Sequence, residues 1–196
     1  MAPNQLNNVV TPAAGLLFTG GRSARMGVDK ALIDVEGEPL VSRVLRALDV
    51  LVPVVIVGGR QEDFGDLDAL WCADLYPGEG PLGALISGMH QVRCDTVVAV
   101  ACDLPHLTSN SVEVLVNQLV TSGGAVAVPL VAGRHQWHVA AWRRDQLAIL
   151  EDAFLRGVRS LYRVAAELGV VSVVFADSNE FLDVDTPDDL SRAFPE

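Results

Sequence analysis

The sequence is short of cysteine and has no long apolar run. Its 196 residues include only three cysteines, an odd number without metal-ligand spacing, so neither a disulfide framework nor a cysteine-based zinc centre is predicted. Their surroundings are apolar, and we expect reduced core thiols at Cys72, Cys94 and Cys102. No apolar run approaches the roughly 18 residues of a membrane span, and no basic segment precedes an apolar one near the N-terminus. We therefore predict neither a membrane span nor a signal peptide, and expect a cytoplasmic protein.

Positive charge is also scarce. The chain has 14 lysines and arginines against 25 aspartates and glutamates, a formal net charge of −11. Nucleic acids and anionic membranes are bound mainly through an excess of lysine and arginine, so neither is predicted as a partner. An acidic protein that binds a phosphorylated ligand has to gather its cations locally or use a metal ion.

Length and composition are those of a compact α/β enzyme. Hydrophobic residues make up 50% of the chain, with 17 glycines and 10 prolines, which excludes disordered and collagen-like classes. Residues 1–12 are rich in Asn, Gln and Pro and carry no periodic pattern, so a flexible tail is predicted there. Residues 13–196 are long enough for a single domain with its own core.

Short apolar runs alternate with helical patterns. Strands are predicted at residues 15–18, 54–57, 96–101, 125–130 and 170–175. Helices are predicted at residues 39–51, 83–92, 109–119, 145–155 and 160–168. A last helix begins after Thr186, where Pro187 suits the first turn and Asp188 and Asp189 are capping acids. The alternation predicts an α/β fold, a three-layer α/β/α sandwich with a mostly parallel, twisted, Rossmann-like sheet.

A glycine-rich loop follows the first predicted strand. Residues 15–30 read Gly-Leu-Leu-Phe-Thr-Gly-Gly-Arg-Ser-Ala-Arg-Met-Gly-Val-Asp-Lys, which places Arg22, Arg25 and Lys30 beside a backbone that can turn sharply. This combination favours a phosphate site over an ordinary turn with surface charges. The loop has neither the Gly-Lys-Ser/Thr ending of a Walker loop nor the Gly-x-Gly-x-x-Gly of a dinucleotide fold, which excludes both.

Asp103 follows a different predicted strand, at residues 96–101. The carboxyl ends of parallel strands meet at one edge of a sheet, where ligands bind, so we expect Asp103 and Gly20 to share a site. Mg²⁺ is bound through one or two carboxylates together with substrate phosphates, which makes Asp103 a candidate metal ligand. The alternative is an aspartate that caps a turn.

Four motifs occur along the chain in the order of a known family. The loop gives Gly-Gly-x-Ser-x-Arg-Met-Gly-x-Asp-Lys, and the others are Tyr-Pro-Gly at 76–78 with Gly-Pro-Leu-Gly at 80–83, Ala-Cys-Asp-Leu-Pro at 101–105, and Asp-Val-Asp-Thr-Pro-Asp-Asp-Leu at 183–190. Together they resemble the small nucleotidyltransferases, most closely the molybdenum cofactor guanylyltransferases. The resemblance covers nearly the whole chain.

The resemblance implies the transfer of GMP from GTP to molybdopterin, with release of pyrophosphate and with Mg²⁺ as cofactor, on a nucleotidyltransferase fold. The residues that it implies for GTP binding are Phe18, Thr19, Gly20, Gly21, Lys30, Asp74 and Asp103. It implies catalytic roles for Arg25, Lys30 and Asp103, and metal binding by Asp103. It also implies transient contact with the proteins that insert or receive the finished cofactor.

Two segments depart from the family pattern, which leaves the acceptor open. Residues 183–185 read Asp-Val-Asp where guanylyltransferases commonly have Asn-x-Asn, so Asp185 is either a second metal ligand or a capping, structural residue. Residues 136–138 read Gln-Trp-His in place of a segment similar to His-Pro-Thr, and the tryptophan either stacks on a planar ring or packs in the core. Because His135 and His138 lack metal-ligand partners at a recognisable spacing, structural roles are expected for both.

Alternatives also remain open for the nucleotide base that is bound and for the reaction that is catalysed. Gly20 and Gly21 favour guanine, because cytidylyl relatives usually carry Ala-Gly at these positions. One alternative is a cytidylyl- or other nucleotidyltransferase that acts on a different phosphorylated acceptor. Another is a GTP-binding regulatory protein without catalysis, although the presence of both Lys30 and Asp103 favours an enzyme.

Overall fold

The computed structural model describes residues 12–20, 30–65 and 67–194. The predicted tail, apart from Pro12, lies outside this part of the chain, and so do Gly21, Arg22 and Arg25 of the glycine-rich loop. Within the described residues, no helix is both long and apolar enough to cross a membrane.

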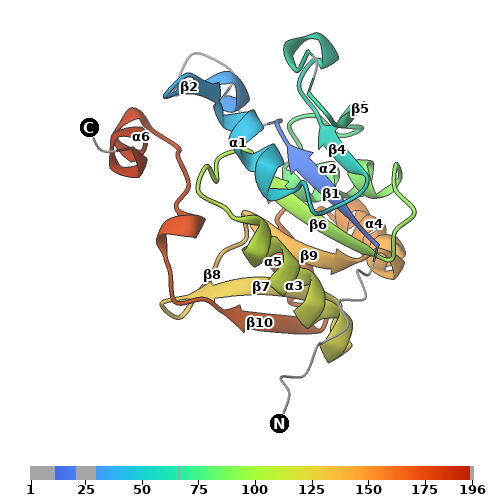
Figure 1. Cartoon of the computed structure of the whole chain (residues 1–196). Coiled ribbons are helices and arrows are strands. Elements are labelled where there is room, and N and C mark those ends of the chain that lie inside the picture. The colour runs from blue at the N-terminus through green and yellow to red at the C-terminus, as the bar shows by residue number, and fades with distance from the viewer. Residues whose placement is uncertain (1–11, 21–29, 66, 195–196) are drawn as a thin grey trace.

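An eight-stranded sheet runs through the middle of the described chain (Figure 1). Seven strands lie in the order β10-β7-β9-β6-β1-β4-β5, and β8 pairs with β7. Their bounds are β1 (Ala13–Phe18), β4 (Val54–Val57), β5 (Leu70–Cys72), β6 (Thr96–Ala101), β7 (Val126–Val131), β8 (Arg134–His135), β9 (Val139–Arg143) and β10 (Val170–Val174). Because β9 and β8 alone pair antiparallel in this sheet, it is mostly parallel, as predicted.

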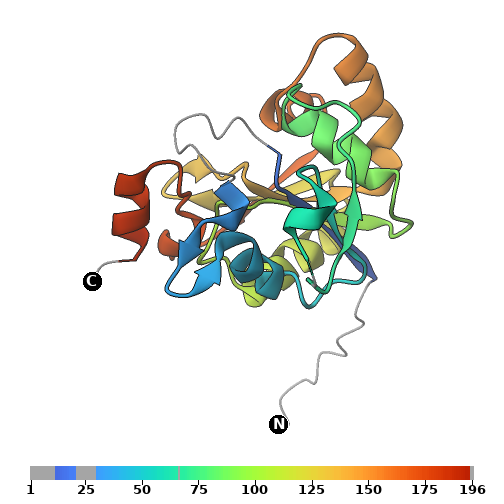
Figure 2. The same cartoon turned by 90° about the horizontal axis from the view of Figure 1, so that it is seen from above.

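Helices cover both faces of the sheet, which confirms the predicted three-layer sandwich (Figure 2). One face packs against α1 (Leu40–Ala47) and α3 (Ser109–Ser122). The other packs against α2 (Pro81–Met89), α4 (Leu147–Leu155) and α5 (Leu161–Ala165). Side chains alternate along β1, so that Leu17 joins the first core while Leu16 and Phe18 join the second.

Short elements connect these layers. A two-stranded ribbon, β2 (Asp34–Val35) with β3 (Glu38–Pro39), precedes α1. The described residues also form four 3₁₀ helices, η1 (Lys30–Leu32), η2 (Gln61–Asp63), η3 (Arg144–Gln146) and η4 (Asn179–Phe181).

The C-terminal helix α6 (Pro187–Ala193) begins as predicted. Thr186 Oγ1 accepts a hydrogen bond from the Asp189 backbone N–H at 3.2 Å, and Asp189 Oδ2 accepts one from the Thr186 N–H at 2.9 Å. This reciprocal capping box confirms Asp189 as a capping acid. It also fixes the direction in which the chain leaves residues 183–185.

Two strands of the sheet that matter for the site were not predicted. β5 has only three residues at an edge, too few for a pattern to show. β9 is inserted antiparallel between β6 and β7, and four of its five residues are buried, so it shows no alternation of polar and apolar side chains. Its insertion brings the residues just before Val139 to the carboxyl end of β6.

Candidate active site

The ends of β1 and β6 lie side by side and place their following residues at one edge of the sheet. Phe18 pairs with Ala101 in the parallel register, and the Cys102 N–H donates to the Phe18 carbonyl at 3.1 Å. Gly20 and Asp103 therefore leave neighbouring strands at the same edge, as expected. Thr19 is buried, and its hydroxyl donates to the Val57 carbonyl at 3.3 Å, so its side chain points into the protein.

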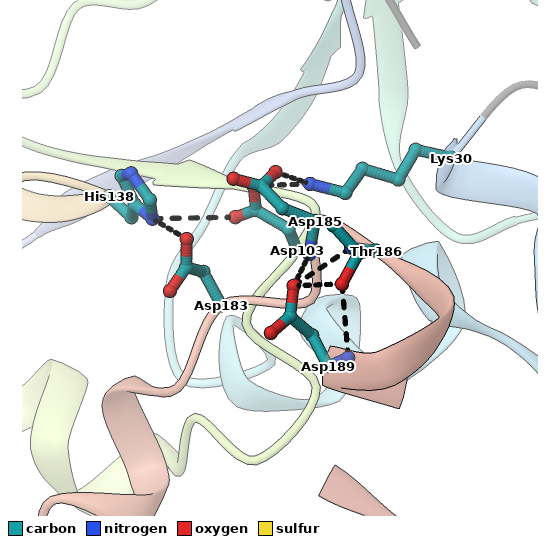
Figure 3. Close-up of polar contacts among 7 residues, drawn as sticks. All are labelled: Lys30, Asp103, His138, Asp183, Asp185, Thr186 and Asp189. Carbon is teal, nitrogen blue, oxygen red and sulfur yellow. Dashed lines mark hydrogen bonds and ion pairs between the residues drawn. The ribbon is translucent and has the colours of Figure 1, made fainter. Parts of the chain in front are cut away.

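Lys30 lies between two carboxylates at this edge (Figure 3). Its Nζ is 2.9 Å from Asp103 Oδ2 and also forms an ion pair with Asp185. Burial disfavours the charged amine, but the two carboxylates outweigh burial, so the pKa of Lys30 is raised above its ordinary value. The hydrogen bond from Lys30 in turn lowers the pKa of Asp185. Lys30 and Asp185 thus hold each other in their charged forms, and the Lys30 ammonium group is within reach of both carboxylates.

Asp103 follows β6 by two residues and is partly buried, with 14% of its side chain exposed. Its carbonyl accepts a hydrogen bond from the Val184 N–H at 3.0 Å, which ties the segment before α6 to the end of the strand. Asp103 Oδ1 is buried and accepts no hydrogen bond from the described residues. A buried carboxylate oxygen without a donor is costly, so this atom is suited to a ligand that the described residues do not supply.

His138 belongs to the same cluster, which the sequence did not predict. Its backbone carbonyl accepts a hydrogen bond from the Ala101 N–H at 2.8 Å, so the start of β9 holds it against the end of β6. The ring Nδ1 lies 3.8 Å from Asp103 Oδ1 and 3.7 Å from Asp183 Oδ2. Only the antiparallel pairing of β9 creates this proximity, and that pairing leaves no signal in the spacing of the residues.

The neighbouring aromatic residues lie away from these carboxylates. His135 Nε2 is 2.8 Å from Ser172 Oγ, and its ring makes an edge contact with Trp137 at 5.7 Å between centroids. Trp137 is partly buried and packs against the core beneath α2 and α4, as the core alternative predicts. The structural role expected of His135 stays a prediction.

Asp74 lies beside Gly20 at the same edge but in a separate group. A Cβ built on Gly58, where φ is +89°, would stand 3.3 Å from the Gly20 nitrogen and 3.8 Å from Asp74 Cβ. Asp74 Oδ1 accepts hydrogen bonds from the Tyr76 N–H at 2.9 Å and from Ser87 Oγ at 3.2 Å. Asp74 therefore shapes a turn, and its predicted contact with a nucleotide stays a prediction.

A metal centre made wholly of protein ligands is not present in the described part of the chain. No group of three or more His, Cys, Asp or Glu side chains there is arranged to hold a metal ion. Asp103 and Asp185 are the two carboxylates that already converge on one cation, the ammonium group of Lys30. Any divalent ion bound here would take further ligands from a substrate.

Solved structures share this fold. A molybdopterin-guanine dinucleotide biosynthesis protein A from Archaeoglobus fulgidus superposes with a TM-score of 0.79 at 22% identity, over 92% of this chain and 96% of that one. A CMP:2-keto-3-deoxy-manno-octonic acid synthetase complexed with CTP gives 0.74 at 16% identity, over 92% and 96%. These likenesses concern the fold alone.

Sequence relatives narrow the class. Residues 15–171 match the family model of the MobA-like NTP transferase domain. A probable molybdenum cofactor guanylyltransferase of Pelotomaculum thermopropionicum is 32% identical over 92% of this chain and 91% of its own length. A molybdenum cofactor guanylyltransferase of Pseudomonas putida is 30% identical over 89% and 93%. The chain belongs to the MobA-like NTP transferase family.

Proposed function

We propose that the protein transfers GMP from GTP to molybdopterin and releases pyrophosphate. The observation that carries the proposal is the Lys30, Asp103 and Asp185 group at the carboxyl edge of β1 and β6. Membership of the family and the names of the relatives support the same reaction. Asp183 and Asp185, which stand where guanylyltransferases commonly have Asn, add negative charge where an acceptor phosphate has to approach, so the acceptor has to be tested directly.

The reaction moves an α-phosphoryl group from one oxygen to another. The protein therefore has to screen phosphate charge, hold the reacting groups in line and stabilise the departing pyrophosphate. Among the described residues, Lys30 is the basic residue that would contact the phosphates of GTP. When GTP binds, the contacts of Lys30 with Asp103 and Asp185 are replaced by contacts with the nucleotide. The backbone at Phe18, Thr19 and Gly20 lies at the end of β1, where it borders the same space.

Asp103 is the residue proposed to hold Mg²⁺. Its Oδ1 atom is buried without a hydrogen-bond donor from the described residues, which fits a carboxylate that ligates a cation. Asp185 reaches the same cation as Asp103, and this supports a second-ligand role for it over a purely structural one. When bound, Mg²⁺ would screen the phosphate charges and polarise the phosphorus centre.

The proposals for the partner proteins and for guanine as the base of the nucleotide are based on the family resemblance. Gly20 is exposed, and a Cβ built on it would meet none of the described residues within 4 Å, so packing against them does not require glycine there. This supports the idea that glycine is needed at position 20 for ligand binding, for example to leave space for the guanine base. Contact with the proteins that insert or receive the finished cofactor remains a prediction.

The test is a turnover assay with two donors and a defined acceptor. The wild-type protein is incubated with molybdopterin and either GTP or CTP, with and without Mg²⁺, and pyrophosphate and the mass of the dinucleotide product are measured. We expect GTP- and Mg²⁺-dependent formation of the guanine dinucleotide. A clear preference for CTP would replace guanylyl transfer by cytidylyl transfer, and GTP binding without any pyrophosphate would indicate a regulatory protein.

A further inference from the structure

The 74–80 loop, from Asp74 to Gly80, is largely exposed yet fixed at both ends. At its start, Ser87 on α2 contacts the Asp74 carboxylate and accepts a hydrogen bond from the Leu75 N–H at 3.0 Å. At its other end, Glu79 forms an ion pair with Arg159, whose Nε donates to Glu79 Oε2 at 2.6 Å. Arg159 lies between α4 and α5, about eighty positions further along the chain.

Arg159 is itself held rigidly. Its Nη1 donates to the Phe154 carbonyl at 2.7 Å and to the Val158 carbonyl at 3.0 Å. Its guanidinium carbon stands 4.0 Å from the centroid of the Phe154 ring, within cation–π distance. A half-exposed ion pair ordinarily contributes little, because two free side chains have to be immobilised. Here the arginine is already fixed by other contacts, so less side-chain entropy is lost when it binds Glu79.

The backbone of Arg159 reinforces the same attachment. Its carbonyl accepts a hydrogen bond from the Leu82 N–H, at the first turn of α2, at 3.2 Å. A Cβ built on Gly80, where φ is +91°, would stand 3.1 Å from that carbonyl oxygen. Gly80 is therefore needed for both its backbone conformation and this close approach. The loop and the start of α2 are docked on residue 159 through its side chain and main chain together.

A contact between two aromatic rings connects Arg159 to the side chains of the loop. Tyr76 packs on Phe154, the ring beneath Arg159, with 4.5 Å between centroids. A Cβ built on Gly83 would clash with Tyr76 at 2.9 Å, so the loop and α2 are in close contact. Because Tyr76 is two residues from Asp74 and donates its N–H to that carboxylate, the position of this ring sets the position of Asp74.

We propose that Arg159 is a positioning residue for the nucleotide, acting through Glu79 to hold the 74–80 loop beside Gly20 at the donor side of the site. The inference rests on the proposed function, which assigns that side to a nucleoside triphosphate. Arg159 does not touch the reacting atoms. Its effect is to keep the loop in its binding conformation before the nucleotide arrives, so that ordering the loop does not weaken nucleotide binding.

The experiment compares Arg159→Ala, Arg159→Lys, Glu79→Gln and the double variant with Arg156→Ala as the matched control. Arg156 carries the same charge three residues earlier, but it pairs with Asp152 and Glu167 instead. Equilibrium Kd for GTP, kcat and KM for GTP, and Tm are measured for each protein. The binding measurement needs no acceptor, so it tests the loop even if the transfer reaction is different.

We expect Arg159→Ala to raise Kd and KM for GTP about tenfold, while kcat at saturating GTP stays within about twofold. Glu79→Gln should act in the same direction more weakly, and Arg159→Lys should restore part of the loss. The double variant should bind no more weakly than Arg159→Ala, because both changes break one link. Arg156→Ala should bind GTP as the wild type does.

Three results would overturn the proposal. The first is an unchanged GTP Kd in Arg159→Ala. The second is additive losses in the double variant, which would mean that Arg159 does not act through Glu79. The third is an equal loss in Arg156→Ala, which would make the effect one of general charge. If the wild type binds CTP in place of GTP, the guanylyl proposal fails and the same comparison is made with CTP.

Discussion

The Asp103 cluster and the 74–80 loop lie at the same edge of the sheet but are held together in different ways. In the cluster, polar side chains meet from separate segments: Lys30 at η1, Asp103 after β6, His138 before β9, and Asp183 and Asp185 before α6. In the loop, backbone hydrogen bonds, a ring contact and a close glycine contact accompany one ion pair.

The contacts in the cluster can be replaced by contacts with a substrate, whereas the contacts that hold the loop remain when a substrate binds. A phosphate can take the place of a carboxylate on Lys30, because both are anions that accept hydrogen bonds from an ammonium group. The backbone and ring contacts of the loop have no counterpart in a nucleotide. We therefore expect the cluster to rearrange when substrates bind and the loop to keep its conformation. Changes in the cluster should alter turnover or the KM for the acceptor, and changes in the loop should alter affinity for the nucleotide.

The largest effect is expected from Asp103→Asn. Removal of the carboxylate charge eliminates the proposed metal ligand, and turnover should fall by about 1,000-fold, the upper range for loss of one preorganised electrostatic group. Initial rates with GTP and Mg²⁺ measure the loss, and circular dichroism checks the fold. Asp145→Asn, which alters a surface ion pair with Arg143, is the control and should keep full turnover. Unchanged turnover in Asp103→Asn would remove this residue from the mechanism.

Lys30→Met should have the next largest effect. Methionine keeps much of the side-chain volume but removes the cation that is proposed to reach the triphosphate. The loss of transition-state stabilisation should be about 3 kcal/mol, or roughly 100-fold in kcat/KM. Steady-state kinetics and GTP titration measure it. If both GTP affinity and kcat matched the wild type, the lysine would serve only to neutralise Asp103 and Asp185.

His138→Ala should have a smaller effect, on the acceptor side. The ring faces Asp103 and Asp183, where a second phosphorylated substrate has to approach, so KM for the acceptor should rise about tenfold, while KM for GTP stays unchanged. His135→Ala, which loses only the contact with Ser172 and the edge contact with Trp137, is the control. A rise in KM for GTP alone would place His138 on the donor side.

Thr186→Ala tests how firmly α6 holds its part of the cluster. Loss of the cap should lower the free energy of unfolding by about 1 kcal/mol at neutral pH, as measured by urea denaturation. The Thr186 hydroxyl and nearby backbone N–H groups lower the pKa of Asp189, so its contribution is complete above the ordinary aspartate pKa and is lost as pH falls below it. The difference between variant and wild type should thus shrink below about pH 4. A constant difference would mean that the carboxylate takes no part in the cap.

The smallest effect concerns thiol reactivity near the loop. Cys72 lies at the end of β5, two residues before Asp74, and burial, with a contribution from Asp74, raises the pKa of its thiol to about 11. It should stay protonated and unreactive at pH 8, whereas the partly exposed Cys94 should be labelled first. Labelling with a thiol reagent followed by peptide mapping decides this. Early labelling of Cys72 in the native protein would show that the loop region opens.

Sequence periodicity and motif order predicted much of this arrangement. The strands at 54–57 and 96–101 were placed correctly, because buried parallel strands form continuous apolar runs. Gly20 and Asp103 reach one edge for the same reason, since they follow neighbouring parallel strands. The place of His138 in the site was not predicted, because β9 pairs antiparallel in the sheet. No local sequence pattern indicates which strands a short apolar run will pair with. The binding and catalytic roles of all the predicted site residues remain predictions: Phe18, Thr19, Gly20, Gly21, Arg25, Lys30, Asp74 and Asp103.

The sequence by itself determined the three-layer class, the family and the chemistry of the residues at the strand ends, because these depend on local periodicity and on motifs. Only the tertiary structure decided which polar and charged side chains contact one another. The pairing of Lys30 with Asp103 and Asp185, the approach of His138 and the link from Arg159 to Glu79 join residues 35 to 155 positions apart. Such contacts depend on strand order and on the direction of β9, which are set by packing of the whole core rather than by any segment alone.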